Sequence, residues 1–137
     1  MEQRDRLKDE IEQLGKVLAK ILSDFLHLKS TGQISQSIKI SNQQLESELD
    51  IDIHQLLALP HKELTTYLQD RQLTTDHIET LAEYLKELGK SEMDTHKENA
   101  TLKLKKAMEL LDIADEISKT ISFDRMHKKN TIAALLN

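Results

Sequence analysis

The residues of this chain best suited to chemistry are six histidines, since the sequence contains no cysteine. Two of them follow an aspartate by three positions: Asp24 with His27, and Asp124 with His127. Helical bundles hold di-iron centres with inward-facing carboxylate and histidine pairs at this spacing, so both pairs are candidate metal ligands. On a helical wheel, however, His27 falls opposite the apolar face of its own segment, whereas an inward site needs both side chains on that face. We therefore predict solvated pairs and no metal ion.

The other candidate groups also form no recognisable site. Glu92 and His96 are four residues apart, but they lie in the polar stretch 90–99, where we expect a loop. The remaining histidines fall near expected helix starts and are predicted to lie on the surface: His54, His61 and His77. No Gly-x-Ser-x-Gly motif is present, and three isolated glycines do not make a phosphate-binding loop. We expect no catalytic residue, no cofactor and no enzymatic activity.

Composition predicts that helices position all of these residues. The 137-residue chain is 38% hydrophobic and 31% charged, and it contains only 3 Gly and 1 Pro. An all-β chain of this size needs many tight turns, which usually require glycine, Asn-Gly or proline. Abundant Leu, Lys, Glu and Gln instead favour helices. We predict an all-α fold of five to seven helices in antiparallel hairpins, forming a single domain over residues 1–137.

Charge and the N-terminal sequence bear on partners and location. The net charge of -5 makes the chain a poor candidate for binding nucleic-acid phosphates. Residues 1–6 are charged and polar and lack the apolar core of a signal peptide. Lys16, Lys20 and Asp24 interrupt the apolar residues that follow, so this segment does not read as a membrane span. We expect a cytoplasmic protein with neither a nucleic-acid nor a membrane partner.

The first thirty residues carry the strongest pattern. Apolar residues recur at three- and four-residue steps, which predicts an amphipathic helix from about Arg4 to Lys29. Four of them are our candidate interface or core anchors: Leu14, Leu18, Ile21 and Phe25. A helix of this length spans roughly 38 Å, more than a domain of this size is wide. Part of the apolar face is therefore expected to project and to be covered by homodimerisation.

Two glycines belong to this segment. Gly15 lies inside the expected helix, where glycine costs roughly 1 kcal/mol relative to alanine. Either the helix tolerates it or another helix approaches closely at this point, and the sequence leaves both interpretations open. Gly32 is expected to form the left-handed stop of the helix.

The middle of the chain predicts three shorter helices: 33–49, a short helix around 53–57, and 61–72. The first is expected to bend or split at Ser41, because serine and asparagine favour caps over helix interiors. Asp50 or Asp52 is expected to cap the short helix. Pro60 then forces a boundary or opens the next helix at its first turn.

The C-terminal half predicts three further helices: one from about residue 74 to residue 89, one over 100–120, and a last one that Ser122 is expected to cap. Asp76 and Glu79 have the spacing of a capping box, although Thr74 or Thr75 is an alternative cap. Gly89 is expected to terminate the first of these helices. The last helix ends the sequence with Ala-Ala-Leu-Leu, and we expect it to dock.

Two segments resemble known families. Ala107, Leu111 and Ala114 have the small-large-small spacing of the second helix of a tetratricopeptide repeat, and the hairpin that contains them resembles one such unit. The stretch Ile11–Lys16, Ile-Glu-Gln-Leu-Gly-Lys, is similar to the opening helix of an uncharacterised family of bacterial all-helical proteins. This resemblance implies a bacterial source and a tetratricopeptide-like region over residues 73–137. It implies no activity and no functional residues.

These observations favour a non-enzymatic helical module that binds or scaffolds other proteins. Such a module would bind by placing the apolar face of a helix in a groove, with a polar rim that gives specificity. We expect the partner to be another protein or a second copy of the chain, in which case a dimer is expected. The alternative is a metal- or small-ligand-binding protein that uses histidines and carboxylates between its helices.

Overall fold

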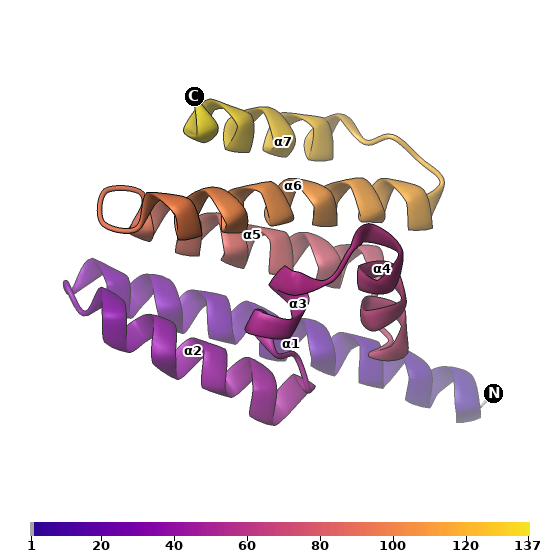
Figure 1. Cartoon of the computed structure of the whole chain (residues 1–137). Helices are drawn as coiled ribbons and strands as arrows, with labels where there is room; N and C mark the ends of the chain where they lie inside the picture. The colour runs from indigo at the N-terminus through magenta and orange to yellow at the C-terminus, as the bar shows by residue number, and fades with distance from the viewer. Residues whose placement is uncertain (1) are drawn as a thin grey trace. The chain divides into compact units, whose positions relative to one another are not determined.

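The computed structural model describes residues 2–137, with side chains from Lys8 onward. These residues form seven α-helices and no strand, which confirms the all-α prediction (Figure 1). The helices are α1 Glu2–Ser30, α2 Ile34–Leu49, α3 Ile53–Ala58, α4 His61–Asp70, α5 Thr75–Glu92, α6 Lys97–Ser118 and α7 Phe123–Leu136. The chain divides into an N-terminal unit that ends at His77 and a C-terminal unit, Ile78–Asn137. The expectation of a single domain over residues 1–137 stays a prediction.

In the N-terminal unit, a short turn connects α1 to α2, and the two helices pack against each other. Gly32 has a φ of 85° in this turn, the left-handed conformation that glycine adopts without strain, as predicted. The predicted break at Ser41 is wrong, because α2 is continuous. The Ser41 hydroxyl donates to the carbonyl of Ser37 at 2.7 Å, so the buried serine is satisfied within the helix.

Two aspartates cap the two helices that meet after α2. Asp50 adopts the left-handed conformation with a φ of 57° and ends α2, and its backbone N–H donates to the carbonyl of Glu46. Asp52 is the N-cap of α3: its carboxylate accepts hydrogen bonds from the backbone N–H groups of His54 and Gln55 at 3.0 and 3.4 Å. Pro60 precedes α4 as its N-cap residue.

The side chain of Arg71 contacts the same junction. The Nε of Arg71 donates to the carbonyl of Asp50 at 2.5 Å, and its Nη1 donates to the carbonyl of Tyr67 at 3.0 Å. The guanidinium also lies 3.4 Å from the centroid of the Tyr67 ring, a cation–π arrangement. The hydroxyl of Tyr67 in turn accepts from the backbone N–H of Asp52 at 2.9 Å. Arg71 therefore ties the end of α4 to the end of α2.

The beginning of α5 confirms Thr74, one of the alternative caps, and corrects the expected position of His77. The Thr74 N–H donates to His77 Nδ1 at 3.0 Å, and the His77 N–H donates to Thr74 Oγ1 at 3.5 Å, which is a reciprocal cap. His77 is buried, not on the surface, and its Nε2–H donates to the carbonyl of Ile11 at 2.9 Å. Because Nδ1 accepts, the proton of the neutral ring is on Nε2.

Gly15 lies next to this histidine. A Cβ built at Gly15 would meet the His77 ring at 3.5 Å, which is ordinary van der Waals contact. Among the described residues, no backbone atom of another helix lies within 4 Å of this Cβ position, so the structure favours the interpretation that α1 tolerates the glycine.

In the C-terminal unit, the prediction that Gly89 ends its helix is wrong. The α5 helix continues to Glu92, and Gly89 is buried at the point where α6 packs against it. A Cβ at Gly89 would lie 2.8 Å from Cγ of Leu104 and 3.2 Å from the carbonyl oxygen of Ala100. Glycine is present here because α6 leaves no room for a side chain. The expected loop of residues 90–99 contracts to the few residues between Glu92 and Lys97.

The last helix, α7, packs against α6. Ser122 caps it as predicted, and its Oγ accepts from the backbone N–H of Arg125 at 3.2 Å. Ile132 is buried on the inner side of α7, which agrees with the expectation that this helix docks. Lys119 ends α6 in the left-handed conformation with a φ of 56°, so the chain turns sharply before α7 begins.

Candidate functional site

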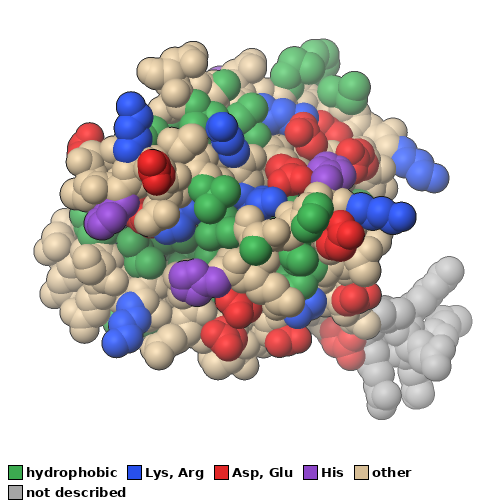
Figure 2. Space-filling model, in the orientation of Figure 1, with side chains coloured by type: hydrophobic (Ala, Val, Ile, Leu, Met, Phe, Trp, Pro, Cys, Tyr) green, Lys and Arg blue, Asp and Glu red, His purple; other side chains and the backbone are tan. Residues whose placement is uncertain are grey.

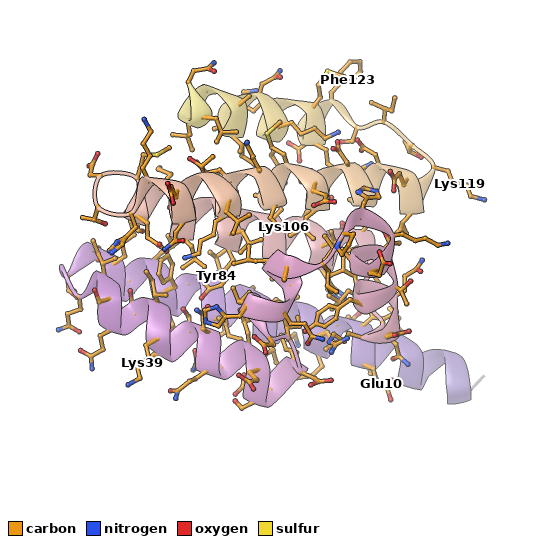
Figure 3. All side chains as sticks on the ribbon, in the orientation of Figure 1. Glu10, Lys39, Tyr84, Lys106, Lys119 and Phe123 are labelled. Atoms are coloured by element: carbon orange, nitrogen blue, oxygen red, sulfur yellow. The ribbon has the colours of Figure 1, made fainter. Side chains whose placement is uncertain are left out.

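The corner between α6 and α7 exposes three large apolar side chains within six residues. Phe123 is 88% exposed, Ile121 is 76% exposed and Met126 is 44% exposed. Figure 2 shows hydrophobic side chains protruding at the upper edge of the molecule, and Figure 3 shows Phe123 pointing outward from the start of α7. Ile121 and Met126 occupy the positions of a hydrophobic staple around the Ser122 cap, but a staple would not leave Ile121 this exposed. We refer to Ile121, Phe123 and Met126 as the α7 corner.

A buried arginine lies directly beneath the α7 corner. The guanidinium of Arg125 donates from Nε to Asp115 Oδ1 at 2.6 Å and from Nη1 to Glu79 Oε2 at 3.3 Å. Its Nη2 donates to Ser118 Oγ at 3.1 Å and to the carbonyl of Thr120 at 3.0 Å. The side chain therefore joins α5, α6 and the turn that carries the corner. We refer to Arg125 and the charged residues described next as the Arg125 network.

Each of the two carboxylates also binds a lysine. Lys128 Nζ donates to Glu79 Oε1 at 3.0 Å, and Lys129 Nζ donates to Asp115 Oδ2 at 2.6 Å. Lys129 lies in addition 2.7 Å from a carboxylate oxygen of Asp112. Both oxygens of Glu79 and both of Asp115 are therefore paired with cations. Such pairing is what allows these charges to be largely withdrawn from water.

The network shifts the pKa values of its members. Burial alone would raise the pKa of Asp115, but hydrogen bonds from Lys129 and Arg125 outweigh it and lower the pKa below the ordinary 3.8. The hydrogen bond with Asp115 raises the pKa of Arg125 above its ordinary value. Burial would lower the pKa of Lys128, but its hydrogen bond with Glu79 outweighs burial and raises the pKa. A similar balance raises the pKa of Lys129. All four groups stay charged at neutral pH.

Beside the network, a pocket of about 230 Å³ opens between α5 and α7. Its lining residues are Glu79, Ala82, Glu83, Lys86, Leu111, His127, Lys128, Thr131 and Ile132. The charged side chains of α5 are paired with each other or with α7, since Glu83 binds Lys86 at 2.7 Å. Within the described residues, the imidazole of His127 makes no hydrogen bond or ion pair. The pocket thus combines apolar side chains with a single unpaired polar group at its rim.

The four anchors proposed from the sequence lie elsewhere, on α1. Leu18, Ile21 and Phe25 are buried, and Leu14 is half-buried. Burial of the first three fits the core alternative for these residues. An interface role stays a prediction, and of the four only Leu14 keeps appreciable exposed surface for it.

The predicted carboxylate and histidine pairs are also placed. Asp24 binds Lys20 at 3.2 Å, and Asp124 lies 3.4 Å from Lys128, so each aspartate pairs with a lysine. His27 and His127 are both exposed. No group of three histidines or carboxylates suited to a metal ion occurs within residues 8–137. Glu92 pairs with Lys103 rather than with His96.

Sequence reasoning missed the α7 corner and the Arg125 network. One signal was present: the helix cap at Ser122 stands between two large apolar residues, Ile121 and Phe123, in an otherwise polar turn. Lys128 and Lys129 pair with carboxylates from other helices, and nothing next to them in the sequence indicates this. Arg125 sits in a polar run of α7, and its partners are 10 and 46 residues away.

Comparisons with family models, with curated proteins and with solved structures found no match. The predicted resemblances therefore have no support from these comparisons. Within the described part of the chain, none of the helices has the length and apolarity needed to cross a membrane.

Proposed function

We propose that this chain is a non-enzymatic protein-interaction module that binds its partner through the α7 corner. The observation that carries the proposal is the exposure of Phe123 and Ile121, which are among the most exposed large apolar side chains described. Exposed apolar residues are common one at a time, but a group of them on one feature marks an interaction site more often. Aromatic side chains of this kind supply much of the binding energy of protein interfaces.

The corner has a second property that suits binding. Arg125 binds the carbonyl of Thr120 and the hydroxyl of Ser118, so the turn before the exposed residues is tied to the helices beneath it. A rigid surface loses little conformational entropy when a partner docks, which favours affinity. The corner therefore presents an apolar contact that is held in place before a partner arrives.

The α5–α7 pocket supports small-ligand binding as a second candidate function. Its volume of about 230 Å³ is below the range typical of drug-sized ligands, roughly 300–1,000 Å³. Glu79, Glu83, Lys86 and Lys128 already bind one another in pairs, so a ligand would have to displace an ion pair or use His127 alone. Protein interaction is therefore the better-supported function. The cytoplasmic location, the bacterial source and the tetratricopeptide-like hairpin remain parts of this proposal.

Site-specific photo-crosslinking in the source cells tests the proposal. A benzoylphenylalanine placed at Phe123 should yield a covalent adduct of defined mass on illumination, because the ring would sit inside the interface. The Ile121→Ser substitution in the same protein should lower the yield several-fold by removing a neighbouring apolar contact.

The matched control carries the photoreactive residue at Lys39, an exposed position on α2 in the N-terminal unit (Figure 3). The proposal requires adducts from position 123 that position 39 does not give. Equal and diffuse labelling from both positions would show that the corner contacts no partner.

A further inference from the structure

We infer that His77 forms an acid-sensitive contact, which joins the middle of α1 to the first turn of α5 while the ring is neutral and opens in mildly acidic solution. The inference does not depend on the proposed function, because its residues belong to the N-terminal unit and the α7 corner belongs to the other unit. We refer to Ile11, Thr74 and His77 as the His77 contact.

The His77 contact uses both nitrogens of one buried ring. His77 is 4% exposed, its Nδ1 accepts from the backbone N–H of Thr74 at 3.0 Å, and its Nε2–H donates to the carbonyl of Ile11 at 2.9 Å. The ring also covers the backbone of α1 at Gly15, since a Cβ built there would lie 3.5 Å from Nε2. Only the neutral ring with its proton on Nε2 satisfies both backbone groups.

His77 occupies a position at which a capping box normally has glutamate or glutamine. Thr74 is the capping residue, and the side chain three positions later accepts a hydrogen bond from its backbone N–H. A glutamine in this position would keep the same charge at every pH, whereas a histidine can take up a proton between about pH 5 and pH 8. The chain therefore has a titratable group where the cap requires only an acceptor.

Protonation would turn this acceptor into a donor. Both nitrogens of an imidazolium carry a hydrogen, so Nδ1–H would face the backbone N–H of Thr74. The positive charge would also be buried at the N-terminus of a helix, where the helix dipole disfavours cations. Because the ring is rigid, turning Nδ1 away from Thr74 also moves Nε2 away from Ile11. Acid should therefore break both hydrogen bonds together.

No charged side chain among the described residues is bound to the ring. The charged residues on the neighbouring parts of α5, α1 and α4 are Asp76, Glu79, Lys8, Glu12, Lys16, Asp70 and Arg71. The contacts of His77 are those with Thr74 and Ile11, so none of these residues forms an ion pair with it. Both oxygens of Glu79 are in addition occupied by Arg125 and Lys128. A protonated ring would therefore have to reach water to be stabilised.

NMR spectroscopy of the full-length chain tests the His77 contact directly. At about pH 7.5 the ring nitrogens of His77 should report the tautomer with the proton on Nε2. As the pH falls to about 5.5, the ring should take up a proton and the amide resonance of Thr74 should shift with the same midpoint. Protection from hydrogen exchange should fall about fivefold at Thr74 and at residues 11–15 of α1, which corresponds to roughly one net hydrogen bond.

His77→Gln is the matched variant that does not titrate in this range. Glutamine can still accept from the Thr74 N–H, so the protection of that amide should stay constant between about pH 7.5 and about pH 5.5. Protection at residues 11–15 should be low at both pH values, because the bond to Ile11 is lost. His54→Gln is the control at an exposed histidine on α3 of the same unit, and it should leave the wild-type response unchanged.

Three results would overturn the inference. The first is a ring that stays neutral down to about pH 5.5, or one that takes up a proton while protection at Thr74 and α1 is unchanged. The second is stronger protection of α1 in acid, which would mean that the charged ring still binds Ile11. The third is the same pH response in His77→Gln as in the wild type, which would assign the response to another group.

Discussion

Two arginines, Arg71 in the N-terminal unit and Arg125 in the C-terminal unit, each hold a helix corner, but they do so with different partners. The side chain of Arg125 is 8% exposed and binds two carboxylates that are themselves largely buried. The side chain of Arg71 is 19% exposed and binds two backbone carbonyls and the face of Tyr67, while the carboxylate of Asp50 beside it is 89% exposed.

The difference determines what each arginine does for the fold. Loss of Arg125 would leave the carboxylates of Asp115 and Glu79 inside the protein with one partner fewer. Loss of Arg71 would leave carbonyls near the surface that water can reach, which costs little. The buried charge cluster around Arg125 therefore holds its corner rigidly, and removing one of its members is expected to lower the free energy of unfolding strongly. Arg71 lies nearer to solvent, and its loss is expected to cost much less.

Arg125→Met should produce the largest effect. Methionine keeps much of the length of the side chain but removes the charge, so we expect a loss of about 3–5 kcal/mol in the free energy of unfolding of the C-terminal unit. Hydrogen exchange should show faster exchange in α7 and at the end of α6. Unchanged protection of α7 would mean that the network does not hold the corner.

Gly89→Ala tests the close packing of the C-terminal unit. Overpacking costs about 1–3 kcal/mol, and the better helix propensity of alanine offsets roughly 1 kcal/mol, so we expect a net loss of up to about 2 kcal/mol in urea unfolding. The fully buried side chain of Leu104 has little room to move away. Gly15→Ala is the matched control in the N-terminal unit, and it should be neutral or stabilising because its Cβ meets no tight contact. Equal effects at both glycines would contradict this assignment.

Arg71→Met tests the arginine of the N-terminal unit. It removes two hydrogen bonds to carbonyls and a cation–π contact, yet it strands no buried charge, so we expect a loss of about 1 kcal/mol. Urea unfolding monitored by hydrogen exchange at α3 and α4 measures it. A loss as large as that of Arg125→Met would show that burial of the carboxylates is not what separates the two arginines.

The stability of the C-terminal unit should depend on pH through the carboxylate of Asp115. The pKa of Asp115 is lower in the folded state, so its contribution is fully present above about pH 4 and is lost as the pH falls through the folded pKa. This carboxylate steepens the acid limb by at most about 1.4 kcal/mol per pH unit. Asp115→Asn should make that limb shallower in urea titrations of the C-terminal unit. Parallel acid limbs in the two proteins would contradict the shift.

The helices were predictable because their signal is local. Apolar residues three and four positions apart, such as Leu81 and Leu85 on α5, define a buried face without any knowledge of what covers it. Caps such as Ser122 depend on a side chain and backbone groups only a few residues away, so that position was also correct.

The errors share a different cause. Gly89 has the same local appearance as a helix stop, and only the position of Leu104 on another helix shows that it serves close packing. The Arg125 network depends on Glu79, 46 residues away, and no periodic pattern reports such a pairing. The α7 corner exists because no other part of the described chain covers Phe123. This exposure depends on the fold, and the residues next to Phe123 in the sequence do not predict it.

The hydrogen bond from His77 to the carbonyl of Ile11 spans 66 residues and has a consequence for biosynthesis. The α1–α2 hairpin needs only its own residues, so it can form early on the ribosome. His77 is synthesised about 3–13 s after Ile11 at typical elongation rates of roughly 5–20 residues per second. During that interval the middle of α1 lacks this contact. A newly made N-terminal unit thus passes through a stage in which the hairpin is present and its closing contact is not, and this is the stage at which a chaperone would find the apolar face of α1 accessible.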